Sequence, residues 1–128
     1  MKITGYHHIG LWTADIEKSL KFYTEGLGGT CVFQFPMSDT GEPIYLVDLG
    51  GGAVVELIPR GEGREEVDAH WHHIALATDD ARAAHQRALD AGATVRNEPS
   101  DCMLGTMAVC NSFVYGPDNE VIEFFQVK

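Results

Sequence analysis

Two histidine pairs and two glutamates are the side chains of this chain best suited to chemistry. One His-His pair occupies residues 7–8 at the start of HHIGLWT, and another occupies residues 72–73 at the start of HHIALAT. Glu56 and Glu123 lie inside the apolar runs VVELI and VIEFF. Divalent first-row metals accept imidazole nitrogens and carboxylate oxygens as ligands, and a carboxylate can also carry a proton. If these groups meet, we expect a metal centre, because two carboxylates without a cation repel each other until one is protonated.

Each motif taken alone has a simpler interpretation. Successive side chains of a strand point to opposite faces, so only one histidine of each pair can face a shared site. A single glutamate between apolar residues is more often an outward-facing residue of a half-buried strand, since charged groups are rarely buried without a partner. The occurrence of the same pattern twice favours the metal site.

The chain repeats itself in three blocks that recur in the same order. HHIGLWT matches HHIALAT at a shift of 65, Gly28-Gly29-Thr30 matches Gly92-Ala93-Thr94 at a shift of 64, and VVELI matches VIEFF at a shift of 67. The pattern indicates a duplicated unit of about 65 residues. We place the repeats at about 5–58 and 71–127, with the Gly-rich, charged stretch 59–70 as the linker. If the halves pack about a pseudo-twofold axis, equivalent histidines and glutamates converge on that axis.

Each repeat is predicted to form a strand, a helix and three further strands. The first helix begins at Asp15 and carries an apolar stripe that ends before Gly28, and the second begins at Asp79-Asp80 and carries an alanine stripe that ends before Gly92. The stripes consist of Ile16, Leu20, Tyr23 and Leu27, and of Ala81, Ala84, Ala88 and Ala91. The predicted strands are 5–12, 30–35, 44–49, 53–58, 71–78, 94–97, 107–115 and 120–127, with 98–106 as a long loop. The sequence therefore predicts an α+β fold of two tandem βαβββ units that form curved mixed sheets around a metal cup.

Composition limits the classes of partner. The chain has 128 residues, 45% of them hydrophobic, and a formal net charge of −10, which fits one globular domain. This charge argues against nucleic acid and against an anionic membrane surface, because both require clustered Lys and Arg. The three cysteines show no C-x-x-C spacing, and we find no secretory signal and no transmembrane run. We expect a cytoplasmic protein that acts on a small molecule.

These motifs carry a resemblance to a known family. The two βαβββ units, the opening HHIGL, the central VVELIP, the second HHIAL and the closing GPDNEVIEFFQ resemble the vicinal-oxygen-chelate superfamily, also described as the glyoxalase, bleomycin-resistance and dioxygenase fold. The likeness covers essentially the whole chain. By the family pattern the metal ligands are His8, Glu56, His73 and Glu123. His7 and His72 then face away from the metal.

Among the members of this superfamily, the chain is most similar to glyoxalase I. That resemblance implies conversion of the hemithioacetal of methylglyoxal and a thiol, normally glutathione, to an S-lactoyl thioester. It also implies one divalent ion, which is nickel, zinc or cobalt, and a homodimer whose two chains can share the ligands. Glu123 is expected to carry the proton, with Glu56 as its counterpart on the other face.

Two positions depart from the glyoxalase I pattern. Trp12 stands where such enzymes usually carry an arginine for the glutathione carboxylate, and Arg60 stands where they usually carry an asparagine. The resemblance therefore supports the metal centre better than a glutathione site. Two alternatives stay open: an epimerase similar to methylmalonyl-CoA epimerase, and a metal-poor protein that binds a toxin or antibiotic. Metal content separates the last from the enzymes.

Three further residues that could do chemistry are expected to lie outside the metal site. His70 and His85 lie outside the motif positions, and we expect both at the surface. Cys102 flanks the predicted loop around Gly105, where it either packs within the loop or lines a pocket for a thiol.

Overall fold

The computed structural model describes residues 1–59, 71–116 and 121–128. The chain separates into two compact units, His8–His72 and Met1–His7 with His73–Lys128, which are described separately. Both contain mixed parallel and antiparallel strands and a helical segment, so the predicted α+β class is confirmed. The predicted linker 59–70 lies outside the described residues apart from Pro59. No helix among the described residues is both long and apolar enough to cross a bilayer.

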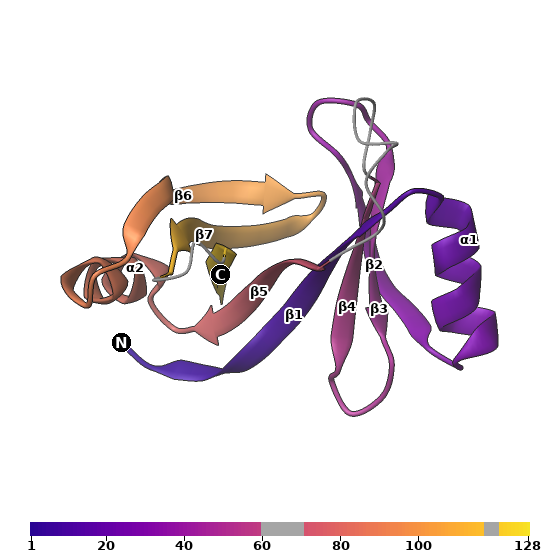
Figure 1. The fold of residues 1–128 in the computed structure, drawn as a ribbon, viewed down its shortest axis with the longest axis horizontal. Coiled ribbons are helices and arrows are strands. Elements are labelled where there is room, and N and C mark those ends of the chain that lie inside the picture. Colours follow the sequence, from indigo (N-terminus) through magenta and orange to yellow (C-terminus); the bar gives the residue numbers. More distant parts are fainter. Residues whose placement is uncertain (60–70, 117–120) are drawn as a thin grey trace. The chain divides into compact units, whose positions relative to one another are not determined.

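The unit His8–His72 is a four-stranded sheet with one helical segment (Figure 1). Its strands have the order β2-β3-β4-β1, and β1 pairs with β4 in parallel while the other pairs are antiparallel. The elements are β1 (Ile3–Thr13), α1 (Ile16–Lys21), a π-helical turn η1 (Phe22–Gly26), β2 (Thr30–Pro36), β3 (Pro43–Asp48) and β4 (Val54–Pro59).

The apolar stripe of the first helix covers one face of this sheet. Ile16, Leu20 and Tyr23 pack against a buried cluster of Val47, Val55 and Leu57. Val55 and Leu57 flank Glu56 in β4, so the alternation of the strand directs the glutamate to the opposite face. The core on one side of β4 thus determines where Glu56 points.

The first helix differs from the prediction at its end. The Leu27 amide donates to the Phe22 carbonyl at 2.9 Å, five residues earlier, which is the wider π-helical turn. One extra residue in a turn rotates everything after it, so Leu27 leaves the apolar stripe and is 55% exposed. The prediction that Leu27 belongs to the buried stripe was wrong for this reason.

Gly29 follows this turn at a point where there is no room for a side chain. A Cβ at Gly29 would lie 2.5 Å from the Tyr23 carbonyl oxygen and 2.8 Å from Val47 Cγ1. The Tyr23 carbonyl accepts the Gly29 amide at 2.9 Å, so it cannot move aside without losing that bond.

We expect Gly29→Ala to lower the free energy of unfolding by about 1–3 kcal/mol, through overpacking against backbone. Urea denaturation measures this change. Gly26→Ala is the matched control, because the nearest atom to its Cβ would be 3.8 Å away. Equal stability of the two variants would contradict the prediction.

The second unit, Met1–His7 with His73–Lys128, has the strand order β5-β8-β7-β6. Strands β5 and β8 are parallel, and the other two pairs are antiparallel. The start of β1 lies beside β5, where the Asp79 amide donates to the Lys2 carbonyl. The elements are β5 (Trp71–Thr78), α2 (Ala81–Asp90), β6 (Thr94–Leu104), β7 (Met107–Tyr115) and β8 (Val121–Val127).

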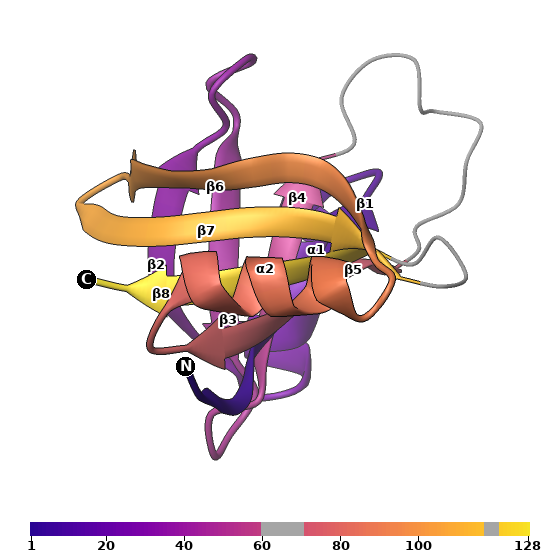
Figure 2. The ribbon, with the colours of Figure 1, turned by 90° about the vertical axis from the view of Figure 1, so that its left-hand side faces the viewer.

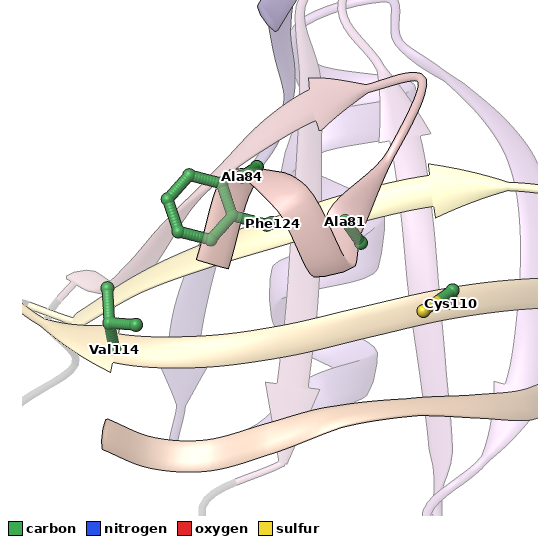
Figure 3. Packing of buried hydrophobic residues seen from close by; sticks show 5 residues of the cluster. All are labelled: Ala81, Ala84, Cys110, Val114 and Phe124. Carbon is green, nitrogen blue, oxygen red and sulfur yellow. The ribbon is translucent and has the colours of Figure 1, made fainter. Parts of the chain in front are cut away.

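Helix α2 covers one face of this sheet and runs along β7 and β8 (Figure 2). Asp80 caps its start, because the Asp80 carboxylate accepts the Ala83 amide at 3.0 Å. Its Ala81 and Ala84 pack with Cys110, Val114 and Phe124 in one buried cluster (Figure 3). The predicted alanine stripe is confirmed at Ala81 and Ala84, and Ala88 packs against the same cluster. The prediction was wrong for Ala91, which is exposed because the helix ends at Asp90. Small side chains let the helix lie close to the sheet.

Two predictions for this unit were wrong. Most of the predicted loop 98–106 is strand, because β6 continues to Leu104. Its register shifts between Asn97 and Ser100 around Pro99, which is tolerated because β6 is the last strand in the order. His85 is 3% exposed on α2, with its Nε2 3.5 Å from a carboxylate oxygen of Glu98, and is therefore not a surface residue. His70 lies outside the described residues.

Candidate metal centre

The unit His8–His72 brings one predicted histidine next to one predicted glutamate. His8 Nε2 lies 3.6 Å from Glu56 Oε1, and both residues are buried. The parallel pairing of β1 and β4 places Gly10 opposite Glu56. Gly10 has no side chain, which leaves space beside the carboxylate for the imidazole of His8, two residues earlier on the same face of β1.

The second unit contains the equivalent pair. His73 Nε2 lies 3.1 Å from Glu123 Oε1, and both residues are buried. Here Ala75 stands opposite Glu123 in the parallel pairing of β5 and β8. A small residue faces the glutamate in each unit, and the histidine comes from the same strand two residues before it. The same local geometry thus occurs at equivalent places of the two repeats.

The other histidine of each dipeptide contacts an aromatic ring. The rings of His7 and Phe125 have centroids 4.0 Å apart, and those of His72 and Trp12 are 4.7 Å apart in an edge-on arrangement. Trp12 and Phe125 are both buried. Trp12 is one of the two departures from the glyoxalase I pattern. The other, Arg60, lies outside the described residues.

A polar network beside Glu123 was missed from the sequence. The Asn111 side-chain amide donates to Glu123 Oε2 at 3.1 Å, and the Cys102 thiol donates to Asn111 Oδ1 at 3.6 Å. Asn111 comes from β7, where it stands opposite Phe125, and Cys102 comes from β6. The available signal was the polar pair Asn111-Ser112 inside the mostly apolar strand β7, but only the strand register shows what Asn111 contacts. Cys102 lies in a strand, so the expectation that it packs within a loop was wrong, whereas its place in a pocket for a thiol stays a prediction.

The donor set suits a divalent cation. Each pair supplies one imidazole nitrogen and one carboxylate oxygen, both removed from bulk water. A buried carboxylate is costly unless a proton, a cation or hydrogen-bond donors neutralise it. Nickel, zinc and cobalt all accept nitrogen and oxygen donors of this kind. The residues present therefore fit a metal ion.

The three cysteines, all within the described residues, are free thiols that differ in environment. Cys31 is exposed, Cys102 is half-buried and Cys110 is buried. Burial, and then the negative charge of Glu123, raises the pKa of Cys102. Burial, and then a hydrogen bond to Asp101, raises the pKa of Cys110. Since the thiolate is the reactive form, a raised pKa slows reaction at neutral pH.

We expect a thiol reagent to modify Cys31 first in the folded protein, Cys102 at least about 10-fold more slowly, and Cys110 only on unfolding. Peptide mass spectrometry over a time course measures the three rates. The Cys31→Ser variant should lose the fast phase and keep the slow one. Labelling of Cys102 as fast as that of Cys31 would contradict the half-buried position and the raised pKa of the Cys102 thiol.

The fold and the site define a small α+β protein with one buried histidine–glutamate pair in each unit. A family model, the "Glyoxalase/Bleomycin resistance protein/Dioxygenase superfamily", matches residues 5–124. The chain belongs to this superfamily, and the resemblance found in its motifs is confirmed.

Named relatives cover nearly the whole chain. A "Probable lactoylglutathione lyase" of Vibrio parahaemolyticus serotype O3:K6 (strain RIMD 2210633) is 31% identical over 125 residues, which are 94% of this chain and 89% of that protein. A "Lactoylglutathione lyase" of Escherichia coli O157:H7 is 31% identical over 128 residues, at 94% and 91% coverage.

Solved structures show the same fold. The crystal structure of methylmalonyl-CoA epimerase from Mycobacterium tuberculosis superposes with a TM-score of 0.79 at 21% identity, and covers 97% of this chain and 88% of that chain. At this identity the likeness concerns the fold alone.

Proposed function

We propose that this protein is a metal-dependent isomerase of the glyoxalase I type. It would convert the hemithioacetal of methylglyoxal and a thiol to an S-lactoyl thioester. The observation that carries the proposal is the buried histidine–glutamate pair found at equivalent positions of both repeats. The names of the relatives, at about one-third identity over most of the chain, agree with it.

In this proposal His8, Glu56, His73 and Glu123 together hold one divalent ion, either nickel, zinc or cobalt. Two imidazoles and two carboxylates give a neutral set with that ion, which removes the repulsion between the carboxylates. When bound, the ion acts as a Lewis acid that polarises the substrate oxygens.

The reaction itself is a proton transfer between neighbouring carbons, and Glu123 is the residue that we assign to it. The Glu123 carboxylate takes the proton from the carbon that bears sulfur, and a proton returns to the adjacent carbonyl carbon. The hydroxyl proton of the first carbon passes to the former carbonyl oxygen of the second, so atoms and electrons balance without a redox partner. Glu56 is its counterpart on the other face of the substrate. Both carboxylates are buried, so bulk water has little access to the proton that they would carry.

The test is turnover of methylglyoxal with glutathione by the apoprotein, before and after addition of Ni²⁺, Zn²⁺ or Co²⁺. We expect no thioester without metal and restored activity at one ion per site. The same samples are also assayed for turnover of methylmalonyl-CoA. Turnover of that substrate alone would favour an epimerase instead. Metal well below stoichiometry, with neither reaction, would favour a binding protein and overturn the proposal.

We also infer a homodimer with glutathione as the thiol, as the family resemblance implies, and a location in the cytoplasm, as the cysteine pattern indicates. Two chains can then share the four ligands. Light scattering after size exclusion measures the mass of the metal-loaded protein. A monomer that still holds the ion would overturn the shared arrangement and leave the isomerase proposal to the turnover test.

A further inference from the structure

We propose that Asn111, oriented by Cys102, is a positioning residue that holds the Glu123 carboxylate and presents one chosen oxygen of it. This inference rests on the proposed function, because it assigns a reaction role to the environment of Glu123.

The two oxygens of Glu123 have different partners. Oε2 accepts the Asn111 amide at 3.1 Å, whereas Oε1 lies 3.1 Å from His73 Nε2. Glu123 is only 3% exposed, so water cannot readily replace a lost donor. Rotation of the carboxylate would break the bond to Asn111. The side chain is thus held with Oε1 toward the imidazole, as the oxygen available to a cation or to a proton.

Cys102 determines which end of the Asn111 amide faces Glu123. The amide has one accepting and one donating end. The Cys102 thiol donates to the Asn111 oxygen at 3.6 Å, which turns the NH₂ group toward the carboxylate. With the amide turned over, the Asn111 oxygen would face the Glu123 carboxylate oxygen, and the two would repel each other. The Cys102 thiol is therefore the first donor in a series of two hydrogen bonds, which starts on β6 and ends at the Glu123 carboxylate.

The equivalent position in the other repeat carries no amide. Asn111 pairs with Phe125, two residues beyond Glu123. In the unit His8–His72, Tyr45 pairs with Leu57, so continuation of that antiparallel register puts Ile44 opposite Ile58, two residues beyond Glu56. Ile44 is buried and has no hydrogen-bonding group in its side chain. The duplicated scaffold thus carries a positioning amide at one glutamate and an apolar side chain at the corresponding place of the other.

This difference has a chemical consequence. A base that takes and returns a proton between two carbons works best when its accepting oxygen stays in one place. Asn111 supplies this restraint to Glu123. Loss of the amide should therefore lower kcat and the affinity for the metal, with little effect on KM, because the proposed role of Asn111 is exerted through Glu123.

The experiment compares Asn111→Ala and Asn111→Asp with the wild type and with Asn97→Ala, an exposed asparagine of β6. Calorimetric titration of each apoprotein with Ni²⁺ gives the metal affinity without any substrate, and kcat and KM are measured on the loaded protein. For Asn111→Ala we expect a loss of about 10–100-fold in Ni²⁺ affinity or in kcat, with KM within about 2-fold. Asn111→Asp has nearly the same size, so it keeps the packing while it replaces the donor by an acceptor, and its loss should be larger.

A second pair of variants tests the outer link without changing Asn111. Cys102→Ala removes the donor and should reproduce part of the loss, whereas Cys102→Ser keeps a donor and should restore most of it. A wild type that binds no Ni²⁺ and forms no thioester would overturn the proposed function. A wild type that does both, while the Asn111 and Cys102 variants match Asn97→Ala, would overturn this inference alone.

Discussion

Glu123→Gln is expected to lower kcat for the methylglyoxal–glutathione hemithioacetal by about 10²–10⁴-fold, the contribution typical of a positioned general base. The Asn111 amide is a donor, so it selects the oxygen of the new glutamine and leaves the NH₂ group toward His73. An amide nitrogen in that place neither takes up a proton nor binds a cation. The substitution therefore removes the base while it keeps the size of the side chain.

The measurement is kcat at saturating Ni²⁺, with the bound metal determined in the same sample. Glu56→Gln is the matched variant in the other repeat, and we expect a smaller loss from it because Glu56 is the counterpart rather than the main proton carrier. Glu17→Gln, at an exposed position of α1, should leave kcat unchanged. A Glu123→Gln protein that holds its metal and retains full activity would contradict the assigned role.

Phe124→Ala is expected to lower the free energy of unfolding by about 3–5 kcal/mol, as usual for a large aromatic residue removed from a core. The Phe124 ring is buried against α2, in the cluster formed with Ala81, Ala84, Cys110 and Val114 (Figure 3). Because the alanines of α2 are short, they cannot reach into the space that the ring would leave.

Urea denaturation, followed by far-UV circular dichroism, measures the loss. Phe22→Ala is the control, since Phe22 is 54% exposed and its truncation leaves no cavity. A Phe124→Ala protein whose free energy of unfolding falls by less than about 1 kcal/mol would show that α2 does not depend on this contact.

Phe124 also separates Glu123 from Phe125 along β8, so its burial against the helix is what directs Glu123 to the other face.

Much of this protein follows from its sequence alone. The duplication, the two-residue period of the strands and the stripes of the helices are local patterns, and each needs only nearby residues to be recognised. They predict the α+β class and the cap at Asp80, and they direct Glu56 and Glu123 away from their apolar neighbours. Which histidine lies beside each glutamate depends instead on the pairing of β1 with β4 and of β5 with β8. The meeting of all four ligands around one ion stays a prediction.

Other features depend on how the strands align and how the chain turns. No sequence period indicates that Asn111 reaches Glu123, because this contact is set by the register between β7 and β8. Leu27 leaves its stripe through a single π-helical turn, and His85 is buried although it lies outside the motif positions. Local patterns determine which face a side chain takes, whereas its neighbours across that face are decided by backbone geometry that distant residues impose together.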